Sequence, residues 1–249
     1  MMTASRRLLI AALLLGCVQT ASAQTADEIV ERHIAAIGGR TALSKLTSRS
    51  NIGTITLTTP VGELTGPIEV LSQRPNKERT LITLDLSSVG AGQMTFDQRF
   101  DGKTGFVIDT LQGNRDITGD QLEAMKNGDF PTPLLSYKEK GIALKLGGRE
   151  KVGDREAYVL IAEPKTGPAV REYIDAESYL LIRTIATLDT PLTGKFEQTT
   201  DLLDYRDVDG FKVPFQVKAT STAQSFVVTL TKVEHNKAFD DSLFARPSN

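Results

Sequence analysis

The sequence predicts a mainly β protein of the α+β class, built on one long antiparallel sheet of about ten to twelve strands. Two observations support this class. From Ser48 onward, apolar and polar residues alternate in short runs, which is typical of strands with one buried and one wetted face. Turn sequences such as Asp101-Gly102, Gly153-Asp154 and Asp209-Gly210 separate the runs, so we expect hairpins between neighbouring strands.

A helix is expected before the sheet, over residues 26–37. Its apolar residues recur at helical spacing, acidic residues occupy its first turn, and Gly38-Gly39 ends it. His33 lies on the apolar stripe and is interpreted as a packing residue. A second, shorter helical turn is expected over residues 41–46.

The strands are predicted from strict period-two alternation. The clearest runs are residues 64–71, 82–86, 94–100, 142–146, 211–217 and 226–230. The links between them are short, which favours antiparallel neighbours over parallel strands joined by helices. His235 follows the last of these runs and is interpreted as a surface or turn residue.

The middle of the chain interrupts the strands. A capping residue precedes a helical stretch at 117–126, and residues 133–140 resemble another helix that Gly141 ends. A helical excursion between two runs of strands can lie across one face of the sheet. We therefore expect a central helical lid over residues 117–141.

Residues 1–23 are predicted to be a signal peptide. Arg6 and Arg7 precede a short apolar run, and cleavage is expected after Ala23, which ends an Ala-Ser-Ala sequence. The apolar run is too short to span a bilayer as a stable helix. In the alternative, Leu-Leu-Gly-Cys17 is a lipoprotein signal and Cys17 is acylated and retained. The mature chain, residues 24–249, is expected to form a single domain.

The composition argues against several classes of function. The chain has a net charge of −2, and loss of Arg6 and Arg7 with the leader makes it −4 (−2 − 2), which argues against nucleic-acid binding. The single cysteine leaves with the leader, so no disulfide or thiolate chemistry is expected. With two histidines and no recognisable nucleophile or phosphate-binding motif, we expect no catalytic residues, no metal and no cofactor.

The remaining signal is apolar. A large antiparallel sheet must cover its apolar face, and the predicted helices are few and short relative to that face. Either the sheet curls tightly enough to bury itself, or it leaves a concave apolar cavity. We expect a lipid cavity lined by Met94, Phe96, Phe100, Phe106 and Ile108 of the strands and by Leu122, Leu134 and Leu135 of the lid.

Several segments resemble a known family when taken together. One is Phe100-Asp101-Gly102-Lys103-Thr104-Gly105-Phe106, and the others are residues 28–30, 37–40, 74–77, 152–158, 173–175, 204–215 and 244–247. Their order and spacing resemble the outer-membrane lipoprotein-sorting proteins of the LolA/LolB-like superfamily, over nearly the whole mature chain. One departure is Ser178-Tyr179, where the family has Thr-Gly, so we expect another conformation at that turn.

The resemblance implies an incomplete antiparallel β-barrel whose open side is closed by helices over an apolar cavity for acyl chains. It also implies a periplasmic, non-enzymatic carrier or binder of lipids or acylated lipoproteins, which we expect to be a monomer. True lipoprotein carriers place a cationic residue at the cavity, for which Arg49, Arg79 and Arg99 are the candidates. The alternatives are an envelope protein-interaction or sensor module with a closed cavity, and a hydrolase.

Overall fold

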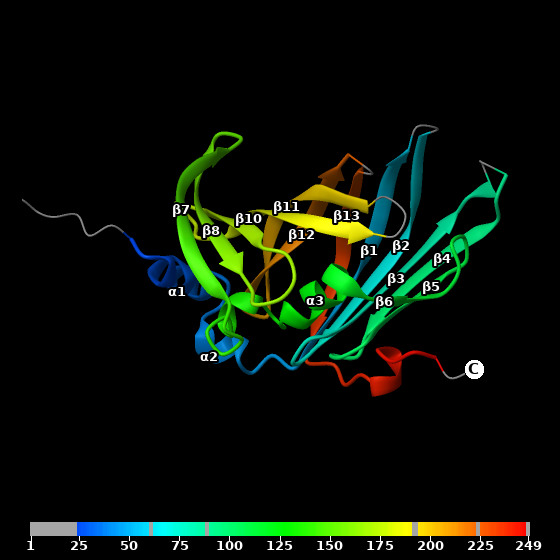
Figure 1. Cartoon of the computed structure of the whole chain (residues 1–249), viewed down its shortest axis with the longest axis horizontal. Helices are drawn as coiled ribbons and strands as arrows, with labels where there is room; N and C mark the ends of the chain where they lie inside the picture. The colour runs from blue at the N-terminus through cyan, green and yellow to red at the C-terminus, as the bar shows by residue number, and fades with distance from the viewer. Residues whose placement is uncertain (1–23, 60–61, 88–89, 191–193, 223–224, 248–249) are drawn as a thin grey trace, which may run out of the picture.

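One antiparallel sheet of 13 strands makes up most of the chain (Figure 1). We describe it from a computed structural model, which describes residues 24–59, 62–87, 90–190, 194–222 and 225–247. The predicted leader, with Cys17 and Ala23, lies outside the described residues. No helix in the described part of the chain is long and apolar enough to cross a membrane.

The first and last strands of the chain pair with each other in the middle of the sheet. The strand order is β6-β5-β4-β3-β2-β1-β13-β12-β11-β10-β9-β8-β7, so β6 and β7 are the two edges and the sheet is not closed. The strands are β1 (Ser48–Thr59), β2 (Gly62–Gln73), β3 (Lys77–Asp85), β4 (Gln93–Phe100), β5 (Gly105–Asp109), β6 (Arg115–Ile117), β7 (Ala143–Val152), β8 (Arg155–Glu163), β9 (Val170–Asp175), β10 (Leu181–Thr190), β11 (Gly194–Val208), β12 (Phe211–Ser221) and β13 (Ser225–His235).

Three helices of the described chain lie on one side of this sheet, which we call its inner face. They are α1 (Ala26–Ala36), α2 (Arg40–Leu43) and α3 (Gly119–Asn127), and the short 3-10 turn η2 (Pro133–Leu135) follows α3. A second 3-10 turn, η3 (Asp241–Leu243), begins a C-terminal segment that contacts the opposite, outer face, where the Ala245 carbonyl accepts from Arg99. The chain between the edge strands β6 and β7 contains α3 and η2, and the sheet curls around this segment (Figure 1). This connection runs from one edge of the sheet to the other, and it does so across the concave side (Figure 1).

The core lies between α1, α2 and the inner face. Ile29, Val30 and Ile34 of α1 are almost completely buried, in one cluster with inward residues of β1, β3, β8, β9, β12 and β13. The N-terminus of α1 has a capping box, in which the Thr25 side chain accepts from Glu28 N–H and the Glu28 carboxylate accepts from Thr25 N–H. The apolar stripe therefore determines which side of α1 faces the sheet, and the cap determines where the helix begins.

Tyr179 anchors α1 to the turn between β9 and β10. Its backbone φ is +57°, the left-handed conformation that glycine adopts readily, so the turn has this geometry without a glycine. The Tyr179 hydroxyl accepts from Arg32 (2.6 Å), its carbonyl lies 2.8 Å from His33 Nδ1, and its ring stacks on Tyr158. His33 is 3% exposed, so its position on the apolar stripe corresponds to real burial.

Two expectations about elements are wrong. The sheet has 13 strands and not ten to twelve, since a strand as short as β6 is too brief to show alternation. Residues 133–140 do not form a helix, because only η2 is helical and turns follow it. There the Tyr137 ring is buried and its hydroxyl donates to Asp27 of α1, a tertiary contact that outweighs the local helical preference.

Candidate ligand-binding cleft

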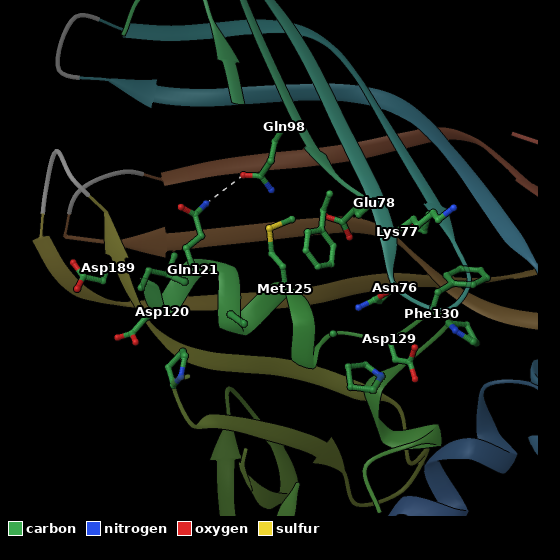
Figure 2. A pocket seen from close by; sticks show the side chains of 18 of the residues that line it. Asn76, Lys77, Glu78, Gln98, Asp120, Gln121, Met125, Asp129, Phe130 and Asp189 are labelled. Carbon is green, nitrogen blue, oxygen red and sulfur yellow. Dashed lines mark hydrogen bonds between the residues drawn. The ribbon is translucent and has the colours of Figure 1, made fainter. Parts of the chain in front are cut away.

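A cleft of about 500 Å³ lies between the inner face and the segment that carries α3 (Figure 2). Its floor comes from β1 to β4, and its cover comes from α3, the segment after it, and β10. The residues that line it are Arg49, Ser72, Asn76, Lys77, Glu78, Gln98, Phe100, Asp120, Gln121, Ala124, Met125, Gly128, Asp129, Phe130, Pro131, Pro133, Pro168, Thr187, Leu188 and Asp189. The lining is therefore both polar and apolar, in contrast to the purely apolar cavity that we expected.

The floor of the cleft is organised by strand register. Arg49 of β1 is the cross-strand partner of Ser72 in β2, Ser72 is the partner of Glu78 in β3, and Glu78 is the partner of Phe100 in β4. On the other side, Arg49 pairs with His235 of β13. Cross-strand partners point to the same face, so these five residues form one row across the inner face, which we call the polar row.

Arg49 lies at one end of the cleft floor. Its Nε donates to His235 Nε2 at 3.1 Å, and its guanidinium lies 5.4 Å from the centroid of the Phe130 ring. Burial lowers the pKa of Arg49 to about 10, so the side chain stays charged at neutral pH. Within the described chain, its two terminal amino groups have no hydrogen-bond partner, and they are available to an anionic group in the cleft.

His235 fixes the position of Arg49. An arginine can only donate, so His235 Nε2 is the acceptor and the imidazole proton lies on Nδ1, 3.1 Å from Asp209 Oδ2. Burial lowers the pKa of His235, which favours this neutral form. The His235 side chain is 2% exposed and packs edge-on against Phe211, so the interpretation as a surface or turn residue is wrong. The register of β13 with β1 turns it inward.

Glu78 is the second charged group of the polar row. In the part of the chain that the structure describes, its carboxylate has no hydrogen bond and no ion pair, and burial raises its pKa. Asp129, by contrast, has partners: one carboxylate oxygen accepts from Ser136, and the other, which is buried without a hydrogen bond, forms an ion pair with Lys140 Nζ at 3.9 Å. Figure 2 shows Glu78 and Gln98 directed from the sheet towards α3, where Gln121 donates to Gln98 at 3.3 Å.

The other charged residues at the cleft have partners. Lys77 forms an ion pair with Asp241 at 2.6 Å. Lys195 lies 3.2 Å from Asp120 and 4.0 Å from Asp189, so it balances the two acids at the opposite end of the cleft. Among the described residues that line the cleft, the charged side chains without an oppositely charged partner are therefore Arg49 and Glu78.

The expected cavity residues separate into four groups. Phe100 lines the cleft, and Phe96 shares its face on β4. Met94, Leu134 and Leu135 pack with the main core, while Leu122 lies on α3 but is absent from the lining. Phe106 and Ile108 are on the outer face, because their cross-strand partners are the outward residues Arg99 and Asp97.

The length of one hairpin connection explains the position of Phe106. Four residues join Phe100 to its partner Gly105, so even-numbered residues of β4 face odd-numbered residues of β5. A shift of one residue moves every side chain of a strand to the other face. On the outer face, the Phe106 ring lies 4.2 Å from the Arg246 guanidinium.

The register also separates the three candidate arginines. Arg79 and Arg99 are on the outer face, where both bind the buried carboxylate of Asp97, at 2.8 and 2.7 Å. Arg49 alone among them lines the cleft. Glu78 is not among the site residues predicted from the sequence. The signal was present, because Glu78 is four residues before Ile82 in β3 and alternation places both side chains on the same face.

Fold and site together define a class of protein: an open antiparallel sheet that curls around an internal cleft. No family model matches the sequence, and no curated protein has significant similarity to it. Solved structures are similar in fold. A LolA superfamily protein from Nitrosomonas europaea has 13% identity and a TM-score of 0.57, covering 90% of this chain and 99% of its own.

Two further solved structures support the same assignment. A DUF1329 family protein from Desulfovibrio piger has 12% identity and a TM-score of 0.57, covering 90% of this chain and 98% of its own. An outer membrane lipoprotein-sorting protein domain from Vibrio parahaemolyticus has 12% identity and a TM-score of 0.55, covering 87% and 95%. The resemblance to the LolA/LolB-like superfamily is thus confirmed at the level of the fold.

Proposed function

We propose that this chain is a non-enzymatic periplasmic carrier or binder of a lipid or an acylated lipoprotein, held in the cleft under α3. The observation that carries the proposal is the cleft itself, of about 500 Å³, with Phe100, Met125 and Leu188 beside the uncompensated Arg49. This volume is within the usual range of small-molecule sites. An amphiphile suits such a lining, since its chain contacts the apolar side chains and its head meets the charge.

The energetics favour an alkyl chain. Each buried methylene contributes roughly 0.8 kcal/mol, so a chain of about ten carbons gains on the order of 8 kcal/mol before ordering costs. No particular side chain is needed for this gain, which is consistent with the absence of a recognisable motif in the sequence. The charged side chains of the polar row would orient the head group of the amphiphile.

The segment that carries α3 is suited to act as the lid. None of the residues of α3 is fully buried, and the helix is held by polar contacts: Gln121 with Gln98, Asp120 with Lys195, and Asn127 with the Thr166 carbonyl at 2.7 Å. Because α3 makes few buried apolar contacts, its local opening costs little free energy. The helix α3 can therefore move away from the sheet while the rest of the lid, which carries Phe130, Leu134 and Tyr137, stays packed in the main core.

An envelope location accompanies this proposal. The predicted signal peptide directs export, and the Vibrio parahaemolyticus structure of the same fold is described as an outer membrane lipoprotein-sorting protein domain. Partners would then be a lipid or lipoprotein and an envelope protein that delivers or receives it.

A matched pair of substitutions on α3 tests the proposal. Ala124→Trp places a large side chain in the cleft, whereas Lys126→Trp adds the same group at an exposed position of the same helix. We expect protein purified from the periplasm to carry co-purifying lipid, detected by organic extraction and mass spectrometry. Ala124→Trp should lose that lipid and Lys126→Trp should retain it. Equal lipid content in both variants, or none in the unmodified protein, would contradict the proposal.

A further inference from the structure

The polar row contains two opposite charges that do not neutralise each other. Arg49 and Glu78 are separated by Ser72, and the structure has no ion pair between them within 4.0 Å. Two strand spacings place their backbones about 10 Å apart. Buried charges are normally paired, so an arginine and a carboxylate held apart in a cleft imply a ligand that meets both.

Arg49 and Glu78 of the row require different chemical groups on a ligand. The free amino groups of Arg49 are donors in a planar fork, which matches the oxygens of a phosphate. The Glu78 carboxylate, which lines the same cleft, is an acceptor with no donor among the described residues. A group with several N–H donors and a positive charge would satisfy this acceptor and offset its charge.

We propose that the cleft selects an amphiphile with a zwitterionic head that bears a phosphate and a primary ammonium, such as a phosphoethanolamine lipid. The phosphate binds Arg49 and the ammonium binds Glu78. The separation of about 10 Å between strands leaves room for a phosphate, a two-carbon link and an ammonium in line. This inference rests on the proposed function and names the substrate class of the same cleft.

The choice of a primary ammonium excludes two common heads. A choline head carries the same charge but has no N–H to donate, so the acceptor at Glu78 would stay unsatisfied. A glycerol head supplies hydroxyl donors but no positive charge, and its phosphate leaves a net anion beside Glu78. Both should bind less tightly than the ethanolamine head.

Calorimetry on the delipidated full mature protein tests this selection. The probes are monomeric lysophosphatidylethanolamine, lysophosphatidylcholine and lysophosphatidylglycerol of equal chain length, with the matching fatty alcohol as a probe without the charged head. We expect the ethanolamine lipid to bind at least about 10-fold more tightly than the other two phospholipids, a difference typical of one charged hydrogen-bonding group. The fatty alcohol should bind weakly but measurably.

Substitutions then test which part of the head binds Arg49 and which part binds Glu78. Glu78→Gln should abolish the preference for ethanolamine, and Arg49→Gln should weaken the binding of all three phospholipids. Glu63→Gln, at an exposed position of β2, is the matched control and should behave like the unmodified protein. Equal affinity for the three heads, or a preference that survives Glu78→Gln, would overturn this inference and leave the carrier standing. Failure of every probe, the fatty alcohol included, would refute the proposed function itself.

Discussion

Glu172 is a buried carboxyl group on the inner face whose removal should make the protein more stable at alkaline pH. It lies on β9 between Leu160 of β8 and Thr184 of β10, and one of its oxygens is buried without a hydrogen bond. Burial raises the pKa of Glu172 from 4.5 to about 7. The perturbation is Glu172→Gln, which keeps the shape of the side chain and removes the charge.

The size of the effect follows from the pKa. Below about pH 4.5 the carboxyl is protonated in both the folded and the unfolded chain, so its ionisation costs nothing. Between pH 4.5 and 7 the unfolded chain releases the proton while the folded chain retains it, and stability is lost as the pH rises. Above about pH 7 the full cost, roughly 3 kcal/mol, is present. The stability of Glu172→Gln relative to the unmodified protein should therefore rise by about 3 kcal/mol from pH 4 to pH 8.

Urea unfolding followed by far-ultraviolet circular dichroism at several pH values measures this difference. For a chain of this size, 3 kcal/mol corresponds to a change in Tm of roughly 6–12 °C. Glu177→Gln, an exposed change in the turn after β9, is the control and should show no such trend. A difference between Glu172→Gln and the unmodified protein that stays constant with pH would refute the reasoning.

Three further predictions concern the cleft and the sheet. His235→Gln keeps an acceptor for Arg49 but cannot be protonated. Burial lowers the pKa of His235, so phospholipid affinity of the unmodified protein should fall only at acidic pH, and it should fall less in this variant, as measured by calorimetry. Phe96→Asp should reduce co-purifying lipid whereas Phe106→Asp should not, and equal loss in both would contradict the assigned faces. A Cβ at Gly66 would lie 2.0 Å from a carbonyl oxygen of β3, so Gly66→Ala should lower the free energy of unfolding by about 1–3 kcal/mol, and an unchanged urea midpoint would contradict that contact.

Alternation within a strand is the most reliable signal in the sequence. Met94, Phe96 and Phe100 are on one face of β4 as expected, because side chains alternate along a strand whatever its neighbours are. The apolar stripe of residues 26–37 likewise corresponds to α1, whose buried side is determined by residues one turn apart. These features are local, so a short stretch of sequence contains all the information that they need.

Features that depend on strand register or on contacts between distant segments were harder to predict from the sequence. The turn between β4 and β5 decides that Phe106 faces outward, and a single residue more in that turn would have reversed it. Residues 133–140 have a helical pattern, yet the burial of Tyr137 against α1 prevents the helix. In the second case a helical preference of less than about 1 kcal/mol per residue is overridden by packing.

By itself the sequence determined the sheet class, the strands, the N-terminal helix and the family that the fold resembles, because each depends on periodicity or on motifs within a few residues. Only the tertiary structure decided which charges meet. Arg49 and Glu78 belong to the same cleft because β1, β2 and β3 pair in one particular register, and His235 joins them because the last strand pairs with the first. Register is a property of paired strands, so residues far apart in the chain become neighbours only when the sheet forms.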